Sequence, residues 1–294
     1  MTLSADFGHT ASQRRTLRWL LLGLAIGVIA PASLFIHDYM LETMKVPYPR
    51  FVGVPDWVKF VNEVVRLFAL AALCRLARPR LRGFSKVTAV LGAGLFMVML
   101  YETIRVWLIE GAITGSLVFS AYSRGSLALC LFLGGAAVAW IMLSDLKREY
   151  TVGLIVGIAA LLAFAIFPPL DRFFASLKDG MPWIKDHYSD PYPFKINVII
   201  YVAFLEPTIA AFVAAWLCWP ALQGGLLRRT LTFATLLLLV RSRFVQLLLQ
   251  SYWIQLPHLT AMYAVSQFFL ETFVLAALSA LAWNYIDGMA ARER

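Results

Sequence analysis

Apolar and polar segments alternate along the whole chain, and eight apolar stretches can be distinguished. A helix needs about 20 apolar residues to cross the hydrocarbon core of a bilayer, and each stretch is close to that length. The pattern therefore predicts an all-α, polytopic integral membrane protein with eight transmembrane helices. The predicted spans are residues 18–37, 57–76, 87–109, 121–144, 151–170, 195–219, 229–250 and 259–285.

Short matches between the two halves of the chain indicate an internal repeat, which has to be considered before any other architecture. Pro47-Tyr48-Pro49 returns 144 positions later as Pro191-Tyr192-Pro193, and Glu63 has its match 143 positions later in Glu206. Further matches keep nearly the same displacement: Cys74 with Cys218, Ser123 with Ser266, and Ala139-Trp140 with Ala282-Trp283.

Four spans in each half is an even number, so both halves start on the same side of the membrane. We therefore predict two parallel four-helix repeats, related by an axis along the membrane normal rather than by inversion. The expected organisation is a cytoplasmic N-terminal tail at 1–17, a first four-helix repeat at 18–149, and a second four-helix repeat at 150–294 that ends in a short cytoplasmic tail.

Composition supports a membrane location and basic residues suggest an orientation. Hydrophobic residues make up 61% of the chain and charged residues 15%, against about 25% charged in soluble domains. With the N-terminus inside, inner segments hold 14 Lys and Arg residues and outer loops hold 7. By the positive-inside rule both termini are expected in the cytoplasm, in a multi-pass protein of a bacterial inner membrane. An alternative interpretation of Arg14-Arg15 and the apolar stretch behind them is a cleaved signal peptide.

The formal net charge of +9 follows largely from this asymmetry, and contact with anionic lipid headgroups explains it more simply than nucleic acid does. Membrane lipids are therefore expected partners, no nucleic acid is expected, and a homo-oligomer or a membrane complex stays open. Neither a metal site nor another cofactor is expected, because the cysteines lie in apolar spans without a Cys-x-x-Cys motif and no histidine lies at mid-membrane.

Charged residues inside the predicted spans are the main functional signal, because ionisable groups at membrane depth are costly and usually face the bundle interior. All of them fall in the outer half of the membrane or near its midplane, which predicts a polar cavity open to the outside. There are five acidic and five basic residues: Glu63, Arg66, Glu102, Arg105, Glu110, Arg124, Glu206, Arg241, Arg243 and Glu271.

Residues three or four apart share a helix face, and several of these charges do so. Glu63 is expected to pair with an arginine, most simply Arg66. A single cavity for an anionic or lipid-linked small-molecule substrate is expected to collect Glu63, Arg66, Glu102, Arg105, Glu206, Arg241, Arg243, Gln267 and Glu271.

Three functions are compatible with these patterns. A transporter or flippase would bind an anionic substrate through Arg105, Arg241 and Arg243, with Glu63 and Glu206 as proton-coupling or gating carboxylates. Repeats commonly form the two halves of such a pathway.

The two alternatives use the same charges differently. An integral membrane enzyme would act at the outer face on a lipid or lipid-linked substrate, with Asp38, Glu63 or Glu102 as acid or base. A non-catalytic membrane assembly subunit would contain the charges only as ion pairs that hold the helices in register. The equal number of acidic and basic groups agrees with this last function.

Overall fold

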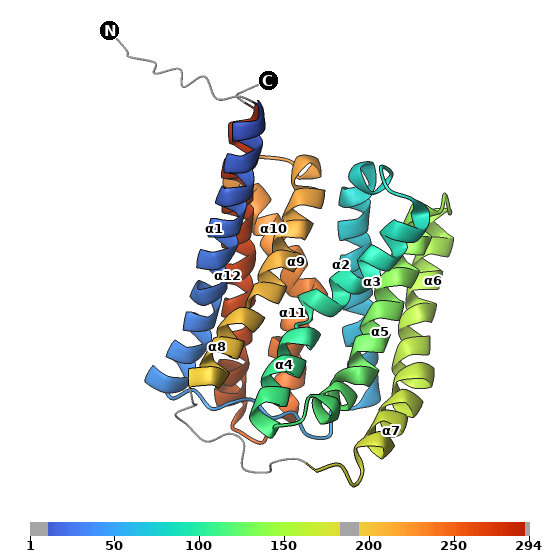
Figure 1. Ribbon diagram of the computed structural model, residues 1–294. Helices are drawn as coiled ribbons and strands as arrows, with labels where there is room; N and C mark the ends of the chain where they lie inside the picture. The colour runs from blue at the N-terminus through green and yellow to red at the C-terminus, as the bar shows by residue number, and fades with distance from the viewer. Residues whose placement is uncertain (1–10, 183–193, 292–294) are drawn as a thin grey trace.

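The computed structural model describes residues 11–182 and 194–291, and within these ranges every regular element is a helix. Figure 1 shows the helices side by side in one bundle, with the two ends of the described chain at the same end. An isolated bridge between Phe51 and Ile254 joins two loops at the opposite end. The prediction of an all-helical protein is confirmed. The second Pro-Tyr-Pro segment, residues 191–193, lies outside the described residues.

Each predicted span corresponds to one helix or to an interrupted run of helices. The first four are α1 (Ala11–Asp38), α2 (Asp56–Leu81), the pair α3 (Lys86–Leu100) and α4 (Thr103–Thr114), and α5 (Leu117–Leu143). The last four are α6 (Arg148–Ala160) with η2 (Leu161–Ile166) and α7 (Phe167–Lys178), the pair α8 (Phe194–Ala203) and α9 (Leu205–Cys218), the pair α10 (Leu226–Val240) and α11 (Arg243–Leu248), and α12 (His258–Ala291).

Five helical segments in the described part of the chain are long and apolar enough to cross a membrane: Thr16–Thr43, Leu117–Leu143, Arg148–Lys178, Ile196–Ala221 and His258–Gly288. The pair α3 and α4, bent by 47°, makes a sixth if it is one span. α2 is 26 residues long but carries charged residues along its length, which lowers its apolar character. The protein is therefore a multi-helix membrane protein, while the count of eight spans stays a prediction.

Local sequence explains several helix ends. Ser85 caps α3 by accepting a hydrogen bond from the Thr88 amide at 3.1 Å, and Ser116 caps α5 in the same way through Phe119 at 3.2 Å. Gly115, with φ of 69°, ends α4 in the left-handed conformation that glycine adopts without steric cost.

Four of the predicted spans are interrupted, and two of them, 87–109 and 229–250, are interrupted at a residue in the left-handed conformation. Glu102 separates α3 from α4 with φ of 59°, and Ser242 separates α10 from α11 with φ of 60°. A residue other than glycine pays about 1–2 kcal/mol for this left-handed conformation. Neither break contains glycine or proline, so contacts elsewhere in the bundle must maintain them.

The two breaks have the same backbone pattern, displaced by 140 residues. At the first break Tyr101 N donates to Met97 O and Glu102 N to Met99 O, and at the second Arg241 N donates to Leu237 O and Ser242 N to Leu239 O. At both breaks, the left-handed residue donates to the carbonyl three residues before it rather than four, so each helix ends in a turn of 3-10 type.

Proline accounts for two further irregularities. Pro207 stands in the first turn of α9, just after Phe204 interrupts the run from α8, and its missing N–H cannot continue a helix through that point. The wide turn η2 immediately precedes α7, which begins with Pro168 and Pro169 in its first turn. Pro31, in contrast, lies inside α1 without ending it.

Helices from different halves of the chain pack together. α1 packs along α12, and α6 and α7 pack along α5, so the first helix of each half contacts the last helix of the other (Figure 1). α2 and α9 contact each other between these pairs. Their buried apolar side chains belong to one core cluster.

Glycine allows the closest helix approach, between α3 and α5. A Cβ added to Gly135 would lie 2.6 Å from the carbonyl oxygen of Ala93 and 3.0 Å from the Cα of Gly94. Small residues at such contacts let membrane helices approach closely.

We predict that Gly135→Ala lowers the free energy of unfolding by about 1–3 kcal/mol, because the new methyl group meets backbone that cannot move aside. Thermal unfolding of the detergent-purified protein measures the effect. Gly157→Ala on α6 is the control, since nothing lies within 4 Å of a Cβ there. Equal melting temperatures for the two variants would show that α3 and α5 are not packed this closely.

Candidate functional site

The two helix breaks are joined to each other by reciprocal side-chain contacts. The guanidinium of Arg241 donates to Oε1 of Glu102, and the hydroxyls of Tyr101 and Ser242 lie 2.5 Å apart. Residues 101 and 102 take the same places at the first break as 241 and 242 at the second. At each break, the residue that follows the helix end bonds to the left-handed residue of the other break. These bonds offset the backbone strain at both positions.

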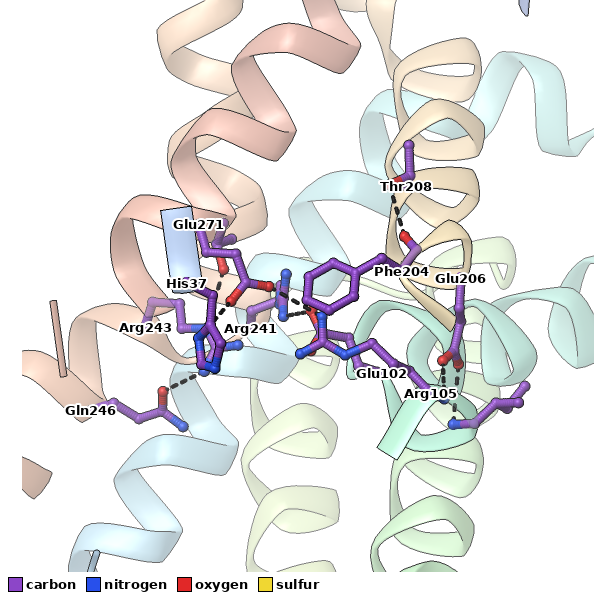
Figure 2. Close-up of polar contacts among 12 residues, drawn as sticks. His37, Glu102, Arg105, Phe204, Glu206, Thr208, Arg241, Arg243, Gln246 and Glu271 are labelled. Atoms are coloured by element: carbon purple, nitrogen blue, oxygen red, sulfur yellow. Dashed lines mark hydrogen bonds and ion pairs between the residues drawn. The ribbon is translucent and has the colours of Figure 1, made fainter. Parts of the chain in front are cut away.

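Glu102 is the centre of a buried series of charges (Figure 2). Its other carboxylate oxygen, Oε2, lies 2.8 Å from Nη2 of Arg105, and Nη1 of Arg105 lies 3.3 Å from Oε1 of Glu271. Nδ1 of His37 lies 3.9 Å from the other oxygen of Glu271. Arg241 and Glu271 are 1% and 0% exposed. Such burial at membrane depth is tolerable because each charge faces one of opposite sign.

Glu206 neutralises a different positive group, the N-terminus of α4. Its carboxylate accepts hydrogen bonds from the backbone amides of Ile104 at 3.2 Å and Arg105 at 2.5 Å. These amides are exposed by the break, and the helix macrodipole adds positive potential there. The ring of Phe204, two residues before Glu206, stacks on the Arg105 guanidinium, and its centre lies 3.8 Å from Cζ of Arg105. Figure 2 shows Glu206 pointing at this helix end.

Arg243, the first residue of α11, is bound by neutral groups. Its Nε donates to Thr272 Oγ1 at 3.2 Å and its Nη1 to Gln246 Oε1 at 2.8 Å. The guanidinium also lies 5.2 Å from the centre of the Phe268 ring. Arg243 is only partly buried, and it has no carboxylate among the described residues within ion-pairing distance.

Phe268 connects Arg243 to the end of α1 and to the loop that follows it. The ring of Phe268, which contacts Arg243, also packs at 5.7 Å against His37 and edge-on at 5.7 Å against Tyr48. Met44 accepts a hydrogen bond from Tyr263 at 3.7 Å. One aromatic side chain on α12 therefore contacts Arg243, His37 and Tyr48.

Glu63 and Arg66 form an ion pair on α2, as their spacing predicts. The side chain of Arg66 is 3% exposed, and its guanidinium lies 5.1 Å from the Tyr101 ring. The pair therefore lies next to the first break, through the contact of Arg66 with Tyr101. Glu110 and Arg124 form another pair at 3.2 Å, between α4 and α5.

The expected site residues are brought together in part. Glu102, Arg105, Arg241 and Glu271 contact one another directly, and Glu206 reaches the backbone of Arg105. Gln267 is fully buried but donates to the Ala264 carbonyl of its own helix, and Asp38 ends α1 in an exposed position. The predicted outward-open cavity stays a prediction, because these contacts describe the pairing of the charges rather than the path of water.

The sequence prediction omitted three groups that contribute to this arrangement. His37 was not assigned to the site, and Tyr101 and Ser242 gave no signal because their role depends on breaks that no glycine or proline marks. Cys74, Cys130 and Cys218 are free and buried, as expected for packing residues. Among the described residues, no group of three or more His, Cys, Asp or Glu side chains could hold a metal ion.

Comparison with protein-family models, with curated proteins and with solved structures gives no match to this chain. Function is therefore inferred from the helix breaks and their charges alone.

The ion pair on α2 gives a direct stability prediction. Glu63→Gln leaves Arg66 buried without a counter-charge and should cost about 3–5 kcal/mol, whereas the double variant Glu63→Gln/Arg66→Met should recover most of that loss. Thermal unfolding in detergent measures both.

The matched control is the exposed pair Asp56 and Lys59 on the same helix, 2.8 Å apart with the same spacing. Asp56→Asn should change stability by no more than about 1 kcal/mol. If Glu63→Gln and Asp56→Asn have equal effects, the buried ion pair is not formed.

Proposed function

We propose that the protein is a transporter or flippase-like membrane protein that moves an anionic or lipid-linked substrate through the region between the two helix breaks. Transporters commonly bind substrates near the midplane with discontinuous helices contributed by two repeats, where free helix ends and backbone groups face the substrate. The paired breaks at Glu102 and Ser242 support this proposal.

The repeat is part of the proposal. In support, the backbone hydrogen bonds at the two breaks are the same after a displacement of 140 residues. The first helix of each half packs on the last helix of the other. In Figure 1, α1 and α6 run in the same direction through the bundle, as a parallel repeat requires. We therefore infer that 18–149 and 150–294 are two parallel four-helix repeats and that the chain crosses the membrane eight times.

The proposal that the substrate is an anion rests on Arg243. Glu102 takes both Arg105 and Arg241 as partners, Glu271 takes Arg105, and Glu206 binds the N-terminus of α4. Arg243 keeps a positive charge that only neutral groups contact. A guanidinium suits phosphate or carboxylate, which it binds with two parallel hydrogen bonds.

Glu206 is the gating carboxylate in this proposal. It occupies the positive end of α4 from inside the protein, at a place where helix termini commonly bind anions. A substrate anion that displaced Glu206 would free the carboxylate and loosen the contact between α4 and α9. Substrate binding and helix movement would then be coupled through one group.

The charge pairing also supports the alternative of an assembly subunit, since Glu63, Glu102, Glu110 and Glu271 each have an arginine partner. It gives less support to an enzyme. Of its candidate acids and bases, Glu63 and Glu102 are held by arginines, and Asp38 lies at the exposed end of α1.

The orientation is likewise proposed from the basic residues: both termini in the cytoplasm and the loop at residues 44–52 outside a bacterial inner membrane. A cysteine in place of Tyr48 should react with a membrane-impermeant maleimide in intact cells, and one in place of Arg80 should react only after lysis. The background carries alanine at Cys74, Cys130 and Cys218. Labelling of position 80 in intact cells would reverse the orientation.

The function is tested by anion-dependent currents in proteoliposomes on a solid-supported membrane, with a panel of phosphate, pyrophosphate, organic phosphates and carboxylates. The wild type should give a saturable current with at least one anion. For that anion, Arg243→Gln should raise the apparent dissociation constant about tenfold or more, which corresponds to the loss of one charge-assisted hydrogen bond to an ion. The melting temperature of the Arg243→Gln variant should stay near that of the wild type.

Arg124→Gln is the control, because it removes an arginine that is already paired with Glu110 and should leave the apparent affinity unchanged. An equal loss in both variants would contradict a binding role for Arg243. If no anion gave a current or shifted the melting temperature of the wild type, the assembly subunit would be the better proposal.

A further inference from the structure

A groove opens between α2, α3 and α9, toward the end of the bundle that holds the two described chain ends. Its volume is about 200 Å³, and its lining is almost entirely apolar. For comparison, an apolar cavity of about 150 Å³ binds benzene. The lining comes from residues between Leu70 and Leu81 on α2, between Phe84 and Phe96 at the start of α3, and between Val213 and Cys218 on α9.

At one position where α3 faces the groove, it carries no side chain. Gly92 lines the groove, and a Cβ added there would meet nothing within 4 Å. Two residues later, on the opposite side of α3, Gly94 lies against α5 so closely that its Cβ would meet Phe132 at 2.8 Å. α3 therefore packs tightly against α5, whereas the space between α3 and α9 is not filled by side chains.

A basic residue, Arg80, lies against an aromatic side chain that lines this groove. The guanidinium of Arg80 lies 5.5 Å from the centre of the Trp216 ring, and Phe84 packs edge-on against the same ring at 6.3 Å. Both aromatic residues line the groove. Nη1 of Arg80 is buried and has no hydrogen-bond partner among the described residues. Its neighbour Arg78 is in contrast paired with Asp145 at 2.5 Å.

We propose that this groove binds one acyl chain of an anionic glycerophospholipid of the surrounding bilayer, with the lipid phosphate accepting a hydrogen bond from Arg80. An apolar groove on the side of a membrane protein is reached by lipid chains, and the guanidinium of Arg80, whose Nη1 has no hydrogen-bond partner among the described residues, suits a phosphate. An anionic headgroup fits better than a zwitterionic one, because Arg75 and Arg82 are exposed at the same end of α2 and add positive charge.

This lipid site shares no residue with the charges at the helix breaks, so it goes beyond the proposed transport function. A lipid held between α2, α3 and α9 would fill a gap between the two halves of the chain. It would bind whether or not Arg243 binds a substrate anion.

Photo-crosslinking tests the site with the full-length protein in phosphatidylcholine vesicles. Each sample contains a small fraction of phosphatidylglycerol or phosphatidylcholine with a diazirine in one acyl chain, and mass spectrometry locates the labelled residues. The phosphatidylglycerol probe should label the groove residues of α2, α3 and α9 more strongly than the phosphatidylcholine probe does.

Two variants and their controls separate the chain from the headgroup. Gly92→Leu should fill the groove and remove this labelling, whereas Gly153→Leu, at an equally open position on α6, should leave it intact. Arg80→Gln should lower labelling by phosphatidylglycerol about fivefold, which is the contribution to binding expected from one basic residue near an anionic lipid. Labelling by phosphatidylcholine should not change in that variant.

Arg82→Gln, an exposed neighbour, should have a smaller effect than Arg80→Gln, and melting temperatures verify that all four variants fold. The proposal is wrong if Gly92→Leu folds and keeps the wild-type labelling of the groove. It is also wrong if the two lipids label the groove equally, or if Arg80→Gln and Arg82→Gln reduce labelling to the same extent.

Discussion

The pairing of charged side chains inside an apolar bundle is the constraint on which the rest of this structure depends. An unpaired charge at membrane depth costs several kcal/mol by most measures, and Glu102, Arg105, Arg241 and Glu271 are all nearly inaccessible to solvent. Each has a partner of opposite sign contributed by another element. Because the partners come from both halves of the chain, their pairing fixes how α4, α10 and α12 meet.

The helix breaks make this pairing possible and link it to function. A continuous helix would hide its backbone amides, whereas the break before α4 exposes the amides that bind Glu206. Thr103 satisfies the Val98 carbonyl freed by the same break, and at the corresponding place in the second half stands Arg243, whose side chain extends away to Thr272 and Gln246. The two halves therefore use the same backbone feature differently. One closes on an internal carboxylate, and the other retains a cation that suits an external anion.

The sequence predicted the composition of this cluster better than its geometry. The apolar runs located the helices, and the spacing of Glu63 and Arg66 was enough to pair them, because residues three apart on a helix are neighbours. The breaks at Glu102 and Ser242 could not be predicted, since both sequences have helical composition and the left-handed residues are stabilised by contacts from distant segments. The two breaks are 140 residues apart, whereas the sequence matches are displaced by 143 or 144, so the matches did not point to residues 102 and 242. The bond from Glu206 to backbone amides had no signal, because a sequence pattern shows which side chains are charged and not which amides are free.

The most direct test of this account is a cryo-electron microscopy map of the protein in lipid nanodiscs, at a resolution that shows side chains. The account predicts that helical density is interrupted at both Glu102 and Ser242, with the Arg241 guanidinium against the Glu102 carboxylate and the Glu206 carboxylate at the N-terminus of α4. Continuous helices through residues 86–114 and 226–248, or breaks that lie apart without the contact between Arg241 and Glu102, would contradict it.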